Sequence, residues 1–221
     1  MDKPTVTVRR VRPGELSSGL KEDLAKILVQ VDDEFEPPLS ARSGTTQAGL
    51  KDLEPVEGGG YLDEMLEQDF ILAFRGDSLA GFLSFRTPHV DTRFPEVCPC
   101  IYVSTIAVGH DHRRAGVARA LYAALFALPP TLPKWIVLRT WTTNEGHLGL
   151  LAELGFESVH TIPDDRAKGV GTVYLAADRS RSKTDVGRAG RLKRWLGFPA
   201  APLPAPAAAA LTPLVRGHQD R

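Results

Sequence analysis

The spacing of hydrophobic residues changes sharply in the middle of the chain. Residues 101–108 form a nearly continuous run of β-branched and aromatic residues, which predicts a strand buried on both faces. Residues 109–114 are polar, and residues 117–128 carry apolar side chains at helical spacing until two prolines end the pattern. A buried strand, a glycine-containing turn and a helix are therefore expected here.

The N-terminal part predicts a strand followed by a long amphipathic helix. Residues 5–11 read as the strand, and after Pro13 one apolar stripe continues at helical spacing until Pro37 and Pro38. The stripe consists of Leu16, Leu20, Leu24, Ile27, Leu28, Val31 and Phe35. The polar segment after it is either a mobile surface loop or one wall of a substrate cleft. The candidate cleft residues are Asp33, Glu34, Phe35, Glu36, Leu39 and Arg42.

Strand and helix patterns continue to residue 176. The expected elements are a short helix over 61–66 after a flexible glycine joint at 58–60, a strand hairpin over 70–74 and 79–85, a strand over 135–140, a helix over 145–154 and a strand over 172–176. Residues 88–99 are expected to be irregular. The predicted order is β-α-α-β-β-β-α-β-α-β.

The composition is typical of a soluble globular protein. With 221 residues, of which 43% are hydrophobic and 24% charged, the chain can bury one sizeable core. The N-terminus has no apolar leader, and no stretch approaches the roughly 18 uninterrupted apolar residues of a membrane helix. We therefore expect a cytoplasmic protein without a membrane span.

Charge is divided unevenly, although the formal net charge is zero. Residues 179–221 contain nine Lys or Arg and two acidic residues, so the part before them is acidic. An acidic body argues against a nucleic-acid partner and tolerates a cationic substrate such as an amine. We expect residues 1–178 to form the domain, and residues 179–221, basic and then rich in Pro and Ala, to be a disordered tail. Apolar residues within 192–198 leave open a short amphipathic helix in that tail.

Cys98 and Cys100 are the two cysteines, and one proline separates them. They are too close for an ordinary disulfide, and they lack the C-x-x-C spacing of a redox or zinc pair. We expect structural, reduced thiols and no metal site.

The turn before residue 117 has the features of an anion-binding site. A helix that begins after a glycine turn directs its first unpaired N–H groups past the end of the preceding strand. Gly116 and Ala118 leave room for a bulky anion, and Arg113, Arg114 and Arg119 add positive charge. This arrangement suits a phosphate group, although an ordinary solvated turn has the same composition.

The residues of this turn also match a known pattern. Arg113, Gly116 and Ala118 fit R/Q-x-x-G-x-G/A, and Val108 stands five residues before the arginine. The stretch therefore resembles the acetyl-CoA-binding motif of the GNAT superfamily of N-acetyltransferases. His110 departs from the proline that the family often has there.

A second stretch extends the resemblance. The family pattern N-x-x-A-x-x-L-Y-x-x-x-G-F is matched at Asn144, Leu150, Gly155 and Phe156. His147 replaces the small residue of the pattern. Leu151 stands where the family often has the tyrosine that protonates the leaving thiolate.

The resemblance covers about residues 5–177 and implies a fold and a reaction. The implied fold is an α/β domain with a mixed, mostly antiparallel sheet of six to seven strands, flanked by helices on both faces. The implied reaction is direct transfer of an acetyl group from acetyl-CoA to a primary amine of a small molecule, peptide or protein; a homodimer is left open. The implied acetyl-CoA contacts are Ile106, Ala107 and Val108 on the strand, Arg113, Arg114, Ala115, Gly116, Val117, Ala118 and Arg119 in the turn and helix, and Asn144.

The general base and acid are open at this stage. The central strand lacks the carboxylate that some relatives use as a base, so we expect Glu34 or Glu36 to act through water. His147 lies one helical turn before Leu151 and could protonate the thiolate, or it could pack without chemistry. The missing tyrosine also leaves open a non-catalytic acyl-CoA-binding module that regulates a partner.

Overall fold

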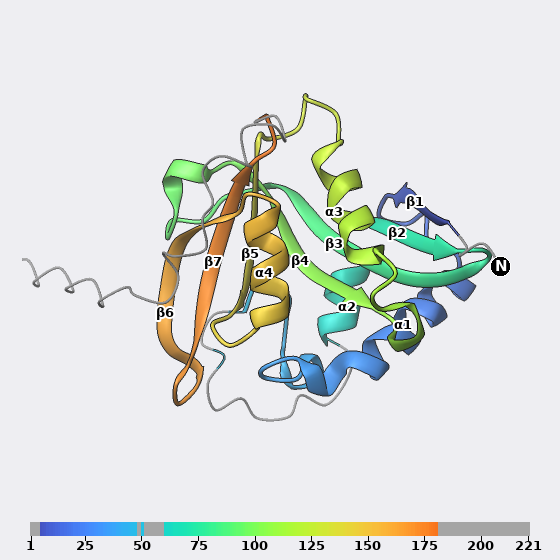
Figure 1. Cartoon of the computed structure of the whole chain (residues 1–221), viewed down its shortest axis with the longest axis horizontal. Helices are drawn as coiled ribbons and strands as arrows, with labels where there is room; N and C mark the ends of the chain where they lie inside the picture. Colours follow the sequence, from blue (N-terminus) through green and yellow to red (C-terminus); the bar gives the residue numbers. More distant parts are fainter. Residues whose placement is uncertain (1–4, 48–49, 51–59, 181–221) are drawn as a thin grey trace, which may run out of the picture. The chain divides into compact units, whose positions relative to one another are not determined.

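A sheet of seven strands forms the framework of the protein (Figure 1). The computed structural model describes residues 5–47, 50 and 60–180. In chain order the strands are β1 (Val6–Val11), β2 (Asp69–Arg75), β3 (Ser78–His89), β4 (Cys100–Val108), β5 (Trp135–Trp141), β6 (Glu157–Ala167) and β7 (Val170–Asp178). Their order in the sheet is β1-β2-β3-β4-β5-β7-β6, and the neighbouring pairs are antiparallel except for β4 and β5. The expected mixed, mostly antiparallel sheet is confirmed.

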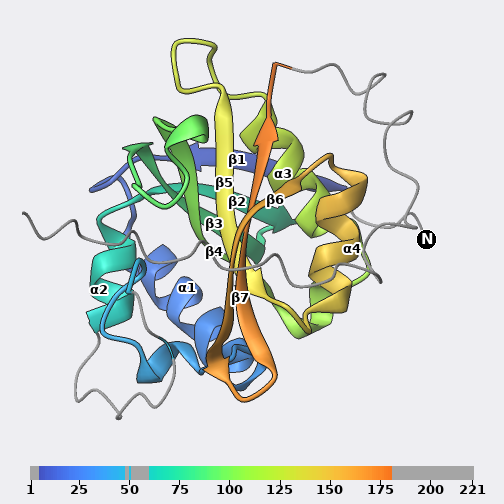
Figure 2. The ribbon, with the colours of Figure 1, turned by 90° about the vertical axis from the view of Figure 1, so that its left-hand side faces the viewer.

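Helices cover both faces of this sheet, as expected. Within the described residues the α-helices are α1 (Ser18–Val31), α2 (Gly60–Leu66), α3 (Val117–Phe126) and α4 (Glu145–Glu153). Figure 2 shows α1 and α2 on one side of the strands and α3 and α4 on the other. Successive strand residues point to opposite faces. Phe70 and Phe82 therefore join the core under α1 and α2, whereas Ile71 and Leu83 join the core under α3 and α4.

The first helix ends earlier than predicted. Ser17 caps its N-terminus and accepts a hydrogen bond from the Leu20 N–H at 3.3 Å. The α-helix stops at Val31 rather than at the proline pair, and Asp32–Glu34 form a 3-10 turn. The end of this segment, including Phe35, lies in the wall of the central cavity.

Two strand predictions were wrong. β3 continues to His89, into the segment expected to be irregular. β6 was not predicted because nearly all of its residues are exposed or only partly buried and its sequence contains Pro163, so it shows no apolar alternation. It pairs with β7 and forms an edge of the sheet, where polar residues and proline are common.

Strand β4 separates from β5 halfway along its length. The parallel pairing between them ends at Val103 and Leu138. On the other edge of β4, the register against β3 shifts, and Ser104 is the extra residue between Val103 and Thr105. Such a bulge bends the bulged strand. The C-terminal halves of β4 and β5 are consequently left unpaired with each other.

Some predictions fall outside the described residues. Residues 58–59 and 181–221 belong to this group, so the flexible joint, the disordered tail and the domain boundary stay predictions. Arg179, which the sequence assigned to the tail, is an exception. Its N–H donates to the Lys134 carbonyl at 2.9 Å and its guanidinium donates to the Pro129 carbonyl at 2.9 Å, so it is attached to the folded body.

Cys98 and Cys100 are free thiols, as expected. Burial raises the pKa of Cys100, and the Asp91 N–H donates to Cys98 Sγ at 3.4 Å. Both cysteines thus contribute to packing and local hydrogen bonding. Among the helices that the structure describes, none is long and apolar enough to cross a bilayer.

Candidate functional site

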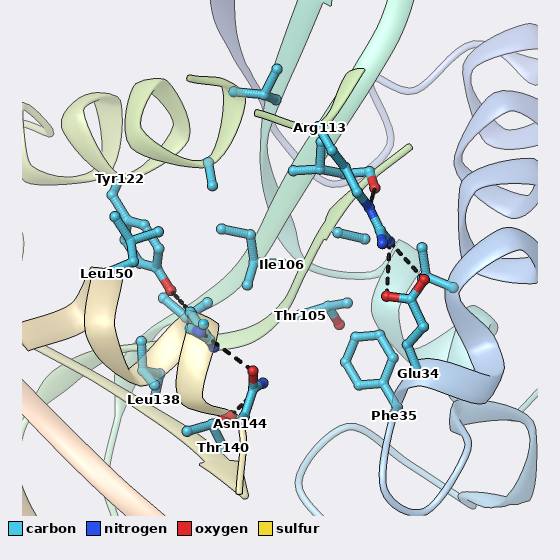
Figure 3. Close-up of a pocket in the computed structure, with 18 of the residues that line it drawn as sticks. Glu34, Phe35, Thr105, Ile106, Arg113, Tyr122, Leu138, Thr140, Asn144 and Leu150 are labelled. Atoms are coloured by element: carbon cyan, nitrogen blue, oxygen red, sulfur yellow. Dashed lines mark hydrogen bonds and ion pairs between the residues drawn. The ribbon is translucent and has the colours of Figure 1, made fainter. Parts of the chain in front are cut away.

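The separation of β4 from β5 opens a cavity of about 670 Å³ (Figure 3). Its walls come from the ends of both strands, the N-terminal halves of α3 and α4, and the segment that follows α1. Figure 3 shows Tyr122 and Asn144 on one side, Glu34 and Arg113 on the other, and Ile106 of β4 between them. The cavity therefore extends from α3 across β4 to the end of α1.

The loop between β4 and α3 has the backbone of an anion-binding site. Arg114 (φ 55°) and Gly116 (φ 80°) are both in the left-handed region, so the chain turns sharply before α3 begins. Gly116 is the N-cap of α3, and its lack of a capping side chain leaves the first N–H groups of the helix available. A Cβ on Gly116 would meet no protein atom within 4 Å. A larger side chain there would enter the space that a bound anion needs.

The predicted loop residues line the cavity with one exception. Those in the lining are Arg113, Arg114, Gly116, Val117, Ala118 and Arg119. Ala115 instead packs against the core under α3. The strand residues Ile106, Ala107 and Val108 also line the cavity. The predicted binding residues are thus brought together, although they span different elements.

The backbone of β4 is available along the cavity. The Gly109 N–H donates to the Ala80 carbonyl of β3 at 3.0 Å, which fixes the edge that this residue faces. Because backbone groups alternate between the two edges of a strand, Ile106 and Val108 face the opposite edge, from which β5 has separated. Arg113 Nε reaches the Val108 carbonyl at 3.4 Å. An extended ligand can therefore pair with β4 as an added strand would.

Asn144 lies in the opposite wall, where it begins α4. Its Oδ1 accepts a hydrogen bond from the His147 N–H at 3.3 Å, and its Nδ2 donates to Thr140 Oγ1 at 3.1 Å. The amide thus caps the helix and ties it to the end of β5. It still contributes to the cavity lining, in agreement with its predicted position.

Comparison with known protein families identifies the family to which this chain belongs. A model of the acetyltransferase (GNAT) family matches residues 39–156, which is more than half of the chain. The chain belongs to the GNAT acetyltransferase family. It is therefore a GNAT-type N-acetyltransferase that depends on acetyl-CoA. No curated protein matches the chain in sequence.

Solved structures share the GNAT fold with this chain. A GNAT acetyltransferase from Desulfovibrio desulfuricans has a TM-score of 0.56 at 14% identity, over 79% of this chain and 99% of the other. An acetyltransferase from Salmonella typhimurium, solved with its cofactor acetyl-CoA, has a TM-score of 0.53 at 14% identity, over 80% and 95%. The ribosomal-protein-S18-alanine N-acetyltransferase from Escherichia coli has a TM-score of 0.51 at 15% identity, over 80% and 96%. At these identities the likeness concerns the fold alone.

Glu34, a predicted general base of this acetyltransferase, is held in an ion pair. Both carboxylate oxygens accept hydrogen bonds from Arg113 Nη2 at 2.8 Å, and Oε1 lies 2.8 Å from His110 Nε2. Partial burial acts to raise the pKa of Glu34, but the hydrogen bonds from Arg113 and His110 outweigh it, and the net pKa is lowered. The carboxylate is therefore ionised and engaged, which makes it a weak base in this arrangement.

Glu34→Gln is expected to lower the Kd for acetyl-CoA about two- to fivefold, because Arg113 then loses a competing carboxylate at an exposed site. Isothermal titration calorimetry measures this. Asp23→Asn is the matched control, since Asp23 also lies on the α1 side and pairs with a basic residue, Lys26, at 2.9 Å. A higher Kd in Glu34→Gln would show instead that Glu34 holds Arg113 in its binding position.

Glu36, the other predicted base, is outside the cavity. It is absent from the residues that line the cavity, and its carbonyl accepts a hydrogen bond from Arg166 Nη1. The α-helix α1 ends at Val31, earlier than the apolar stripe predicted, and the residues after it therefore do not continue along the helix axis. The geometry thus gives no support to Glu36 as a base.

His147, the predicted acid, lies in the cavity wall as one of a hydrogen-bonded pair. Its Nε2 is 2.8 Å from the Tyr122 hydroxyl, which comes from α3. Burial lowers the pKa of His147 to about 4 and raises the pKa of Tyr122, so both groups are neutral near pH 7. A neutral imidazole cannot serve as a cationic acid, so the predicted role of His147 as an imidazolium donor has no support from this geometry.

Sequence reasoning missed Tyr122. The residue sits among apolar neighbours on α3 and is fully buried, so helical spacing alone assigns it to the core. One signal was present, because a buried tyrosine hydroxyl normally requires a partner. That partner, His147, is 25 residues away and meets Tyr122 only in the folded chain.

Proposed function

We propose that this acetyltransferase moves an acetyl group from acetyl-CoA directly to a primary amine of a small molecule or peptide. The observation that carries the proposal is one cavity that joins an anion-binding helix N-terminus, an open strand edge and a separate acceptor wall. Acetyl-CoA has a pyrophosphate, an extended amide-containing arm and a thioester. These three parts correspond in order to the loop 109–116, the edge of β4 and the centre of the cavity.

Named residues would hold acetyl-CoA. The first N–H groups of α3, with Arg113, Arg114 and Arg119 nearby, would bind the pyrophosphate. The backbone of Ile106 and Val108 would pair with the amides of the arm. The open space at Gly116 supports this fit, because it leaves the helix N-terminus accessible.

The thioester of acetyl-CoA supplies an activated acetyl group. The amine nitrogen bonds to the carbonyl carbon, and the C–S bond breaks. The nitrogen then loses a proton and the sulfur gains one. Backbone N–H groups at the open edge of β4 would stabilise charge on the carbonyl oxygen. The walls orient the amine against the thioester, which removes much of the entropic barrier. Glu34 remains our candidate for accepting the amine proton through water once Arg113 is engaged elsewhere.

The proton for the sulfur is assigned to the Tyr122–His147 pair. If His147 Nε2 carries a hydrogen and donates to the Tyr122 oxygen, the phenol hydrogen is free to point into the cavity. The phenol can then donate to the departing sulfur, and the imidazole stabilises the oxygen that remains. The pair would take the role of the tyrosine that the family often has at the position of Leu151. Leu151 itself is buried in this protein.

A screen of amines, amino acids and peptides with acetyl-CoA tests the proposed function. We expect thiol release with at least one acceptor and a mass-spectrometric product acetylated on nitrogen. Tight CoA binding by calorimetry without thiol release from any acceptor would overturn the proposal. It would favour the non-catalytic acyl-CoA-binding module instead.

A further inference from the structure

Three arginines gather behind the acceptor wall of the cavity, and we call Arg42, Arg139 and Arg166 the arginine cluster. They come from the segment after α1, from β5 and from β6. Arg42 and Arg166 are only 5% and 4% exposed, and Arg139 lines the cavity. Two buried cations and a third that is partly buried, all from separate parts of the chain, are an unusual feature of a protein interior.

Two aromatic rings connect the cluster to the cavity. The Arg42 guanidinium lies 5.6 Å from the Phe35 ring centroid, and the Arg166 guanidinium lies 5.6 Å from that of Trp141. The Phe35 and Trp141 centroids are 5.8 Å apart, and both rings line the cavity. Arg139 precedes Trp141 by two residues on β5, so both side chains are on the same face of the strand. The cluster therefore surrounds the acceptor wall.

The hydrogen bonds of the cluster are made mainly to carbonyl oxygens. Arg42 Nη2 donates to the Pro37 carbonyl at 2.6 Å, and Arg139 Nη1 donates to the Gln47 carbonyl at 2.6 Å. Arg166 donates to the Glu36 carbonyl and to a threonine hydroxyl. Carbonyl groups satisfy the donors but do not cancel the charge. Arg139 uses two of its five N–H groups on the 45–47 segment and also contacts the Tyr174 hydroxyl, so part of its guanidinium stays available to a ligand.

The cluster differs from two partly buried arginines, Arg10 and Arg93, in its lack of a carboxylate partner. Arg10 forms an ion pair with Asp69 at 2.8 Å, and Arg93 forms one with Asp91 at 2.5 Å. Within residues 5–47, 50 and 60–180, no ion pair involves a member of the cluster. Asp32 and Asp165 influence Arg42 and Arg166 from a greater distance.

The members of the cluster also repel one another. Burial, with a contribution from Arg139, lowers the pKa of Arg42 to about 10. Burial, followed by repulsion from Arg42 and Arg139, lowers the pKa of Arg166 to about 9. Uncompensated buried charge is costly, and an anion placed among these groups relieves that cost.

We propose that the acceptor amine carries a carboxylate, as an amino acid does, and that Arg139 binds it at the wall formed by Phe35 and Trp141. This inference rests on the proposed function and names its substrate class. A guanidinium with free N–H groups matches the two oxygens of a carboxylate. Arg42 and Arg166 add to the positive field without touching the ligand. The phosphates of acetyl-CoA are not the anion concerned, because their predicted site is the N-terminus of α3 and the loop before it, whereas Arg139 belongs to β5.

Matched acceptors test this proposal on the unmodified protein. For several side chains, the amino acid, its carboxamide and its decarboxylated amine are compared by kcat/KM. We expect the amino acid to be preferred at least about tenfold, as for a charge-assisted pair. Carboxylic acids of the same side chain without the amine should compete with the acceptor. Equal rates for all three acceptors and no competition would overturn this inference but not the proposed function, whereas no acetylation of any acceptor would overturn both.

Arg139→Gln should lower kcat/KM for the amino acid at least about tenfold and change that for the carboxamide less than about threefold. Arg139→Lys should restore part of the preference, because it keeps the charge but loses the paired geometry. Arg10→Gln is the control, since it removes an arginine that already has a carboxylate partner. Equal losses for both acceptors in a folded Arg139→Gln protein would show that Arg139 only supports the 45–47 segment.

Discussion

Gly116→Glu is expected to abolish acetyl-CoA binding, with a Kd more than about a hundredfold above that of the wild type. Gly116 is the N-cap of α3 at φ 80°, and a Cβ there projects into open space. A glutamate would place its carboxylate at the N–H groups of the helix, where it is stabilised by the helix dipole. The carboxylate would thus occupy the predicted pyrophosphate site and repel the phosphates of acetyl-CoA.

Gly76→Glu is the matched control for this substitution. Gly76 in the β2–β3 turn also has a positive φ, of 60°, and a Cβ there meets no atom within 4 Å. Both variants therefore carry a similar backbone penalty of about 1–2 kcal/mol for a side chain in the left-handed region. Calorimetry measures the Kd, and thermal melts confirm folding. Wild-type affinity in folded Gly116→Glu would show that the cradle has been assigned to the wrong loop.

Tyr122→Phe is expected to reduce kcat at least about tenfold and to leave the acetyl-CoA Kd nearly unchanged. The phenylalanine keeps the ring, which packs edge-on against Phe156 at a centroid distance of 5.8 Å, and removes only the hydroxyl. Tyr174→Phe is the control for the loss of a buried hydroxyl, because Tyr174 is equally buried and is not among the residues that line the cavity. Its hydroxyl accepts from Arg93 and also contacts Arg139, so the two variants are compared by kcat at saturating acceptor. Stopped-flow or steady-state assays of thiol release provide the rates.

The pH profile separates Tyr122 from His147 as the proton donor. Because burial lowers the pKa of His147 to about 4, the imidazole is predominantly neutral near pH 7. The wild-type rate should therefore show no histidine inflection near the ordinary pKa of about 6.5. An inflection there that disappears in His147→Gln, with normal kcat in Tyr122→Phe, would restore the imidazolium as the acid.

The parts of this site that the sequence predicted are those encoded locally. The turn with Arg113 and Gly116 joins a buried strand to a helix within a few residues, and its chemistry follows from that order alone. Asn144 is also local, because a helix N-cap is determined by the residues beside it. The edge strand β6 was missed because its sequence lacks an apolar pattern. An edge strand pairs with a neighbour on one side only, and polar residues are common there.

The other parts depend on contacts between distant segments. Tyr122 meets His147 across two helices, and Arg42 approaches Arg139 and Arg166 only when the segment after α1 folds against β5 and β6. Contacts of this kind cannot be predicted from the spacing of residues along the sequence. The same applies to Glu34, whose partner Arg113 is 79 residues away.

The ion pair between Glu34 and Arg113 has a consequence for how the two substrates bind. It joins the acceptor side of the cavity to the loop before α3, and an anion that takes Arg113 Nη2 displaces Glu34 from it. Displacement frees a carboxylate at the acceptor side, where an incoming ammonium group can use it. By thermodynamic reciprocity, an acceptor that engages Glu34 strengthens the hold of the loop on acetyl-CoA by the same factor. This linkage makes each substrate bind more tightly when the other is already in the cavity, whichever of them enters first.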